Sequence, residues 1–226
     1  MVKQKKMKNI FADKATLVLR KMIRDPNKKW VVRDFVGQEG VSLGMAQEVL
    51  AAMERRGYTE RVKKGPESYS ILTNRERLIK DWLEKYQFEL NEINTYYSPE
   101  RNILNKIKSN LEESQYALTL HTGANFITHF VRTDHMYIYI NAETWDKDTL
   151  IIRQKLGLKE LVRGGNIHFI SPYYKKSLFA YLQKIKGYRV VSNLQLYLDL
   201  YHFQPRGRAH AEYLNKILEN KGIPCV

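Results

Sequence analysis

Cysteine is almost absent from this sequence, and so are long apolar runs. The one cysteine among 226 residues is Cys225, so neither a disulfide within the chain nor a cysteine-rich metal site can form. No apolar run approaches the roughly 20 residues that span a bilayer. No apolar signal-peptide core follows the basic start MVKQKKMKNI. We therefore expect a cytoplasmic protein with no membrane partner. Residues 1–11 are expected to form a flexible basic arm, with a DNA-tracking tail as the alternative.

Acidic residues are scarce relative to basic ones, and the imbalance is uneven along the chain. The whole chain has 38 Lys and Arg against 24 Asp and Glu, a net charge of +14. Residues 1–80 hold 19 basic and 9 acidic residues, whereas residues 81–226 hold 19 and 15. Excess charge is informative about partners rather than about fold. A polyanion such as double-stranded DNA is the natural partner of the first third.

The first third begins with three short helical patterns. Apolar residues recur at helical spacing over residues 12–24, with Asp13 as the expected N-cap. A second short helix is expected over residues 30–36. A third opens at Ser42, whose hydroxyl can cap its free amides, and closes at Gly57.

After these helices the pattern changes to that of strands. Residues 58–62 and 69–72 alternate as strands do, and the turn over residues 63–68 has a basic tip. Three short helices followed by such a hairpin resemble the winged helix-turn-helix class. The sequence therefore predicts a winged helix DNA-binding domain over residues 12–75. Winged helices also dock proteins, but the basic tip argues against that role here.

The third helix offers candidate contacts to DNA bases. A buried face at Ala46, Val49, Leu50 and Met53 leaves the amino-terminal half of the helix free to reach base edges. Glutamine pairs with adenine and glutamate with cytosine, whereas basic side chains contact phosphates and so position the protein. The alternative is that the basic residues only solvate the surface. The candidate DNA-binding residues are Lys28, Lys29, Arg33, Ser42, Met45, Gln47, Glu48, Arg55, Arg56, Arg61, Lys63 and Lys64.

The rest of the chain predicts a second, larger domain. An amphipathic stripe indicates a connecting helix within residues 76–94, which either packs one domain on the other or forms a dimer seam. We expect a turn at residues 94–99 and a domain border near 95. Strands mixed with helices over residues 95–226 favour an α+β domain with a small mixed sheet. Helices are expected at residues 99–109, 124–130, 144–156, 177–184 and 192–201, and strands at 116–120, 135–140, 161–162, 166–170 and 188–191.

One segment of this domain is similar to the nucleotidyltransferase fold. YALTLHTGANFITHFVRTDHMYIYI reads as a strand, a Thr-Gly turn, a helix and a second strand that carries Asp134. Those enzymes place a second carboxylate two residues later to hold divalent ions, but this chain has Met136 there. A thioether cannot replace a hard oxygen ligand for magnesium. The six histidines show no tight ligand spacing. We therefore expect a degenerate nucleotidyltransferase-like fold with no catalytic residue, metal or cofactor.

Four stretches of the chain resemble one family. YALTLHTGA, VRTDHMYIYI, GGNIHFISPYY and VVSNLQLYLDLYHFQPRGRAHAEYL are similar to AbiEi-like antitoxins, the transcriptional regulators of type IV abortive-infection systems. Gln204-Pro205 and Leu120 depart from the family pattern, so the resemblance does not predict the exact geometry of the turns beside them. The residues that match its last motif are Ser192, Gln195, Leu196, Tyr197, Leu198, Asp199, Leu200, Arg206, Gly207, Arg208, Ala209, Ala211 and Glu212.

The resemblance implies a DNA-binding repressor of antitoxin type rather than an enzyme. Such a protein would bind inverted repeats at its own promoter, as a homodimer on DNA, and counter a nucleotidyltransferase toxin without touching it. Gln195 and Asp199, one helical turn apart, are expected to tie loop amides or the guanidinium of Arg206. Carboxylates of its own domain are expected to hold Arg206, whereas the role of Arg208 stays open. The alternatives are a nucleotidyl- or phosphotransferase and a ligand-gated regulator.

Overall fold

The computed structural model describes residues 9–65 and 67–223, which form two compact units. Unit 1 ends at Tyr86 and unit 2 begins at Gln87, ahead of the border expected near residue 95. Most of the expected basic arm, residues 1–8, lies outside the described residues. Its last residues do not behave as an arm: Ile10 and Phe11 are buried, and the Phe11 ring lies 5.7 Å from that of Trp82.

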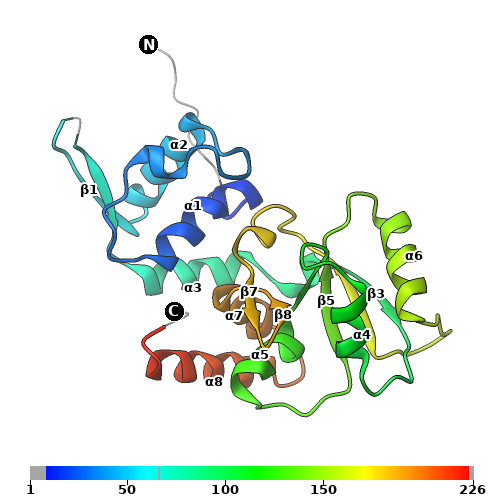
Figure 1. The fold of residues 1–226 in the computed structure, drawn as a ribbon. Helices are drawn as coiled ribbons and strands as arrows, with labels where there is room; N and C mark the ends of the chain where they lie inside the picture. The colour runs from blue at the N-terminus through cyan, green and yellow to red at the C-terminus, as the bar shows by residue number, and fades with distance from the viewer. Residues whose placement is uncertain (1–8, 66, 224–226) are drawn as a thin grey trace. The chain divides into compact units, whose positions relative to one another are not determined.

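Unit 1 consists of helical segments followed by a hairpin and a further helix (Figure 1). The elements are α1 (Asp13–Arg24), η1 (Val32–Phe35), η2 (Gln38–Gly40), α2 (Leu43–Arg55), β1 (Thr59–Val62), β2 (Tyr69–Leu72) and α3 (Arg75–Lys85). Strands β1 and β2 pair antiparallel, with Thr59 opposite Leu72. Trp30 extends this sheet, since it exchanges two backbone hydrogen bonds of 2.9 and 2.8 Å with Ser70. The hairpin thus has a third, single-residue strand beside it.

The prediction of a helix over residues 30–36 is wrong for most of this segment. Trp30 belongs to the sheet, and only Val32–Phe35 turn, as a 3-10 helix. The Asp34 carboxylate accepts a 2.9 Å hydrogen bond from the Val31 amide and so fixes the start of that short turn. Asp13 is also not the N-cap of α1. It is the first helical residue, and Ala12 occupies the cap with no side-chain hydrogen bond.

The core of unit 1 is rich in large rings and in residues of one α2 face. Trp30, Tyr58 and Trp82 are each at most 1% exposed. The predicted buried face of α2 is confirmed, since Ala46, Val49, Leu50 and Met53 are all buried. Burial of one face leaves the opposite side of α2 in solvent.

Unit 2 is built on a mixed sheet, as the sequence predicted. The strand order is β3-β6-β5-β4-β8-β7; the β5–β6 and β4–β8 pairs are parallel and the others antiparallel. The elements are η3 (Phe88–Leu90), β3 (Glu92–Tyr96), α4 (Ile103–Asn110), β4 (Tyr116–Leu118), α5 (Leu120–Thr128), β5 (Met136–Ile140), α6 (Trp145–Leu156), β6 (Ile167–Ser171), η4 (Phe179–Tyr181), β7 (Gln183–Ile185), β8 (Tyr188–Val190), α7 (Asn193–Tyr201) and α8 (Gly207–Asn220).

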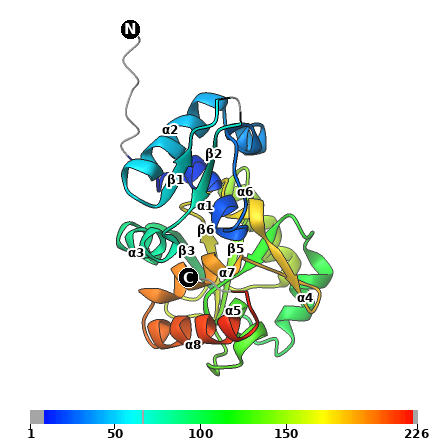
Figure 2. The ribbon, with the colours of Figure 1, turned by 90° about the vertical axis from the view of Figure 1, so that its left-hand side faces the viewer.

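One group of helices packs together in unit 2. Helix α8 runs alongside α7, and α5 contacts both (Figures 1 and 2). Side chains alternate along a strand, and in β5 the ring of Tyr137 meets that of Phe203 while the Tyr139 hydroxyl reaches Asp199 in α7. The Tyr137 and Tyr139 side of the sheet therefore faces α7. Helix α4 packs on α6.

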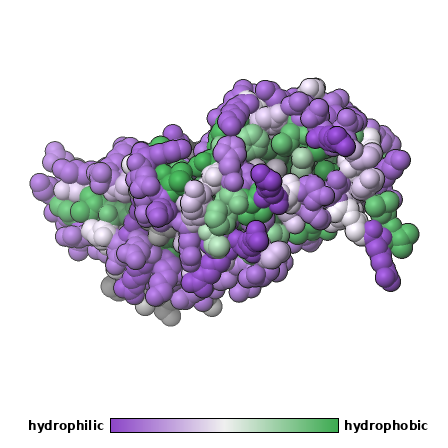
Figure 3. Space-filling model, turned by 90° about the horizontal axis from the view of Figure 1, so that it is seen from below, coloured by the Kyte–Doolittle hydropathy of each residue, from purple (hydrophilic) through white to green (hydrophobic). Residues whose placement is uncertain are grey.

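The surface of the molecule mixes polar and apolar side chains. Hydrophilic residues cover most of the face in Figure 3, and apolar residues gather in patches between them. Exposed large apolar side chains of unit 2 include Leu150, Ile151, Leu161 and Val162. Among the described residues, no helix has both the length and the apolarity needed to cross a membrane.

Three local predictions for unit 2 are wrong. Residues 94–99, expected as a turn, begin inside β3, where Asn94 lies opposite Phe169. Residues 177–184 form only a 3-10 turn and the start of β7 rather than a helix. Residues 161–162 are exposed and not in a strand. Short apolar runs do not distinguish strand from helix by period alone, so the partner strands decided these segments.

The expected Thr-Gly turn at Thr122-Gly123 is also absent. Both residues lie inside α5, which begins at Leu120. A Cβ atom on Gly123 would lie 2.8 Å from the Leu118 carbonyl oxygen and 2.9 Å from a methyl of Leu196. Glycine is therefore needed here for the close approach of α5 to β4 and α7, not for a turn.

Candidate functional site

The amino-terminal half of α2 is capped and exposed. The Ser42 hydroxyl accepts a 3.2 Å hydrogen bond from the Met45 amide, which confirms the predicted cap. Leu43 and Gln47 are exposed, whereas Met45 and Glu48 are half-buried. The start of a helix carries partial positive charge and free amides, which favour an anionic partner.

The tip of the β1–β2 hairpin is held by its own hydrogen bonds. The Ser68 hydroxyl donates to the Gly65 carbonyl oxygen at 2.7 Å and accepts from the Lys64 amide at 3.1 Å. The side chains of Lys63 and Lys64 are exposed. Because neither lysine side chain takes part in these hydrogen bonds, both ammonium groups are available to a partner.

The remaining basic candidates of unit 1 differ in how far their own unit engages them. Lys28 lies 3.8 Å from the Asp34 carboxylate and over the ring of Trp30, and Lys29 lies over the ring of Tyr69. These contacts at exposed positions are weak and compete with solvent. The structure places Arg33, Arg55 and Arg61 as exposed side chains and Arg56 as a half-buried one.

The carboxylate of Asp199, in the carboxy-terminal motif, is completely buried. It accepts hydrogen bonds from the side-chain amide of Gln195 at 2.6 Å, the Thr119 hydroxyl at 2.5 Å and the Tyr139 hydroxyl at 3.2 Å. The Ser192 hydroxyl caps the same helix, since it accepts a 3.2 Å hydrogen bond from the backbone amide of Gln195. Asp199 therefore connects α7 to β5 and to Thr119, the N-cap of α5. Burial keeps both Gln195 and Asp199 from an external ligand.

The turn expected at Arg206-Gly207-Arg208 is instead the start of α8, with Arg206 as the N-cap and Gly207 as the first helical residue. A Cβ atom on Gly207 would clash with the Leu200 carbonyl oxygen, so the start of α8 requires glycine for close packing. Arg206 is the N-cap of α8 in the left-handed region, at φ 63°, and its side chain is exposed. The sequence predicted a carboxylate partner for Arg206; within residues 9–65 and 67–223 none lies at ion-pair distance.

Arg208 has a local partner. Its guanidinium Nε donates to Glu212 at 3.1 Å, one turn along α8, and lies over the ring of Tyr201. This hydrogen bond raises the pKa of Arg208. Since the pair is exposed, it adds little to stability, and the guanidinium stays accessible to solvent.

Two histidine pairs in unit 2 were missed by sequence reasoning. His121 and His210 stack with their ring centroids 5.1 Å apart and their Nδ1 atoms 2.8 Å apart. Burial lowers the pKa of both rings, and the neighbouring His121 contributes to lowering that of His210 to about 4. The partners are far apart in the sequence, so no spacing signal could have found them.

The contacts of this pair suit two neutral rings. The Pro205 carbonyl, 3.3 Å from His121 Nε2, can only accept, so that nitrogen carries the proton. With both rings neutral, His121 Nδ1 accepts from His210 Nδ1, and His210 Nε2, 2.7 Å from the Thr128 hydroxyl, is an acceptor. Burial, which lowers the pKa of both rings, favours these neutral forms.

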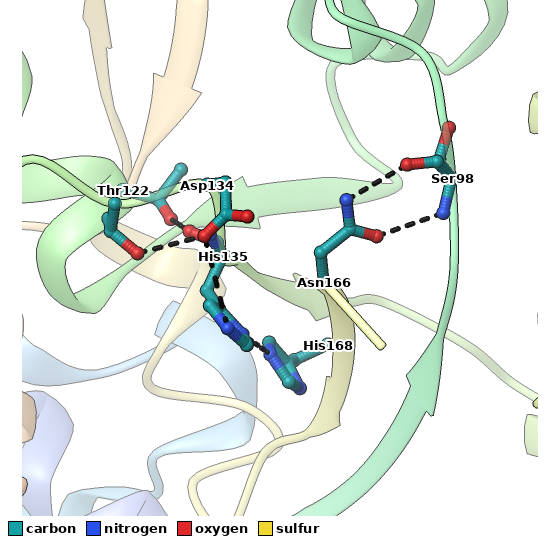
Figure 4. A network of polar contacts seen from close by, with 7 residues as sticks. Ser98, Thr122, Asp134, His135, Asn166 and His168 are labelled. Atoms are coloured by element: carbon teal, nitrogen blue, oxygen red, sulfur yellow. Dashed lines mark hydrogen bonds and ion pairs between the residues drawn. The ribbon is translucent and has the colours of Figure 1, made fainter. Parts of the chain in front are cut away.

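The second pair, His135 and His168, lies at the start of β5 and β6 (Figure 4). His135 Nδ1 is 2.8 Å from His168 Nε2, and the Thr95 hydroxyl is 2.9 Å from the other nitrogen of His168. Burial, with the adjacent His135, lowers the pKa of His168 to about 4. The Asp134 carboxylate lies 4.0 Å from His135 Nε2, with a side chain 87% exposed.

A two-way clamp fixes the backbone beside this pair. The Asn166 side-chain amide donates to the Ser98 carbonyl oxygen, and its oxygen accepts from the Ser98 amide, both at 2.9 Å (Figure 4). The Thr122 hydroxyl donates to the His135 carbonyl oxygen at 3.3 Å. Among the described residues, no three His, Cys, Asp or Glu side chains form a group that could hold a metal ion.

These features define the class of protein: an α+β chain with a basic helical-and-hairpin unit and a mixed-sheet unit. Residues 71–219 match the model of the family described as transcriptional regulator, AbiEi antitoxin, type IV toxin–antitoxin system. The match spans more than half of the chain, so the chain belongs to this family of regulatory antitoxins. No curated protein and no solved structure matches the chain. The matched region includes nearly all of unit 2, whereas α1 and α2 precede it.

Proposed function

We propose that this transcriptional regulator binds double-stranded DNA through unit 1, acting as a winged helix-turn-helix. The observation that carries the proposal is the amino-terminal half of α2, which is capped by Ser42 and presents Leu43 and Gln47 to solvent. In proteins of this class, the corresponding helix enters the major groove. The order of helices and hairpin in unit 1 supports the same role.

The contacts divide into those that specify sequence and those that position the protein. Gln47, which is exposed, would read an adenine edge in the major groove. The exposed ammonium groups of Lys63 and Lys64, at the hairpin tip, would contact phosphates beside the groove. The remaining basic candidates of unit 1 would add phosphate contacts on either side.

The proposal extends to regulation of the protein's own operon. The family description, an antitoxin of a type IV system, supports autorepression. A homodimer on inverted repeats would match the two-fold symmetry of such an operator. In this account the chain acts in the cytoplasm and does not bind the toxin directly.

The test is the affinity of the full chain for its upstream DNA, measured at several salt concentrations. Each lost phosphate contact should reduce the slope of log K against log salt by about 1, so Lys63→Ala with Lys64→Ala should reduce it by about 2. The matched control is Lys175→Ala with Lys176→Ala, which removes two adjacent exposed lysines of unit 2. The control should bind with the wild-type slope. Wild-type affinity and slope in the hairpin variant would remove the wing from the proposal.

A nucleotidyl- or phosphotransferase is the alternative from another class. The strand, helix and strand around Asp134 are its main support, but Met136 replaces the second carboxylate and lies in β5. Calorimetric titration of the full chain with ATP and magnesium tests it directly. Magnesium-dependent binding that Asp134→Ala abolishes would favour the enzyme.

A further inference from the structure

Unit 2 contains a hollow of about 210 Å³ between α5, the start of β5 and the β7–β8 turn. Phe126, Leu104 and Met136 supply its apolar wall, and His129, His135 and Lys186 supply its ionisable groups. We call it the β7–β8 pocket. Its volume is below the roughly 300–1,000 Å³ of pockets for drug-sized ligands, so it suits a smaller molecule.

The Lys186 backbone adopts a conformation that lysine rarely takes. Lys186 and Gly187 form the two-residue turn between β7 and β8, where Ile185 pairs with Tyr188. Both turn residues have positive φ, 52° and 83°. Such a turn strongly prefers Asn, Asp or Gly at its first position. Lysine there gives up local stability and supplies a cation to the pocket.

His129, on the other side of the pocket, also has a backbone conformation that its residue type rarely adopts. It ends α5 in the left-handed region, at φ 55°, a position that Gly or Asn usually occupies. Strained backbone of this kind persists where the surrounding structure holds it, and it clusters at ligand sites. Two residues whose backbone conformations disfavour their own side chains therefore line one pocket.

The charge in the pocket is of one sign. No carboxylate is among its lining residues. Asp134, which faces His135 at 4.0 Å, is not part of the lining, and its side chain is largely in solvent. Lys108 adds positive charge beside the turn, since a Cβ atom on Gly187 would clash with its ammonium.

The other polar side chains of the lining are already engaged. Asn125 exchanges hydrogen bonds of 2.6 and 3.2 Å with the Val131 backbone, and the Thr133 hydroxyl accepts from the His135 amide. In contrast, within the described part of the chain the exposed side chains of His129 and Lys186 have no hydrogen-bond or ion-pair partner. These two groups are therefore the donors that a ligand would meet.

We propose that the β7–β8 pocket binds a small organic anion that has a planar apolar part. Lys186 and His129 would hold its phosphate or carboxylate group, and Phe126 with its apolar neighbours would cover the planar part. The site is independent of DNA binding, so it can be tested whether or not unit 1 contacts an operator.

The test is calorimetric titration of the full chain, without DNA, with four probes. Phenyl phosphate and benzoate carry a ring with each type of anion, inorganic phosphate lacks the ring, and benzyl alcohol lacks the charge. We expect one of the two aromatic anions to bind with a Kd below about 1 mM, and inorganic phosphate and benzyl alcohol to bind at least about tenfold more weakly. The stronger aromatic anion identifies the group that the site prefers. If neither aromatic anion reaches that affinity, or if benzyl alcohol binds equally well, the proposal fails.

A substitution separates binding from folding. Lys186→Asn places a preferred residue in the turn, so the melting temperature should stay the same or rise while affinity for the aromatic anion falls at least about tenfold. His129→Asn should behave in the same way at the end of α5. The control, Lys175→Asn, removes an exposed lysine outside the pocket and should keep wild-type affinity. Unchanged affinity in both pocket variants would overturn the proposal.

Discussion

The two units use their polar residues in opposite ways. In unit 1, the polar and basic candidates on the hairpin and the start of α2 are mostly exposed. In unit 2, Gln195, Asp199 and His210 are fully buried and have partners within their own unit. Polar side chains thus face solvent in one unit and hold the fold together in the other. Substitutions should therefore weaken binding in unit 1 and stability in unit 2.

The largest effect should come from Asp199→Ala. Removal of the carboxylate leaves the buried hydroxyls of Thr119 and Tyr139 without their acceptor, which should cost about 3–5 kcal/mol of unfolding free energy. Hydrogen exchange of α7 peptides across a urea series measures this locally. The control is Glu212→Ala, at an exposed carboxylate, which should leave exchange unchanged. A loss below about 1 kcal/mol in Asp199→Ala would contradict the structural role of the motif.

Acidification should weaken unit 2 through its buried histidines. The pKa of His210 is about 4 in the folded chain against 6.5 for an unperturbed ring, so the unfolded chain binds more protons between these values. Stability is therefore intact above pH 6.5 and falls as the pH drops towards 4, by up to about 3 kcal/mol for this group. Urea midpoints across this pH range measure the loss. The His210→Gln variant should show a flatter pH dependence, and an equally steep one would rule out His210 as the cause.

Gln47→Ala should change which DNA is preferred more than how tightly DNA is held. Loss of one bidentate base contact costs about 1–3 kcal/mol at a single base pair. Competition between the operator and single-base variants measures this discrimination. The comparison is Arg61→Ala: loss of this phosphate contact should weaken binding to all DNA sequences equally. Equal discrimination by Gln47→Ala and the wild type would remove Gln47 from the reading surface.

The smallest effect should come from Ser42→Ala. Loss of the cap on α2 should cost about 1 kcal/mol of stability in unit 1, whereas Ser42→Asp should restore it. Hydrogen exchange of the first turn of α2 reports the change. Protection in Ser42→Ala equal to that of the wild type would show that the cap contributes nothing.

Local chemistry made parts of unit 1 predictable. The cap at Ser42, the buried face of α2 and the paired strands of the hairpin depend on neighbouring residues, and the sequence predicted all three. In unit 2, the mixed sheet and the α7 helix were also predicted from pattern. Phosphate contacts and base contacts of unit 1 stay predictions.

Long-range contacts decided what the sequence could not show. Strand β3 forms because β6 pairs with it, and residues 183–185 become a strand because β8 follows across a tight turn. The burial of Asp199 depends on Thr119, 80 residues away. No local pattern encodes such partners. The two histidine pairs and the β7–β8 pocket were missed for the same reason.

The most direct test of the account is hydrogen exchange of the full chain with and without its upstream DNA duplex. The account predicts that bound DNA protects residues 42–48 and the hairpin around residues 62–69, while α6 exchanges as in the free chain. Protection confined to unit 2, with the start of α2 and the hairpin unchanged, would contradict the assignment of DNA binding to unit 1.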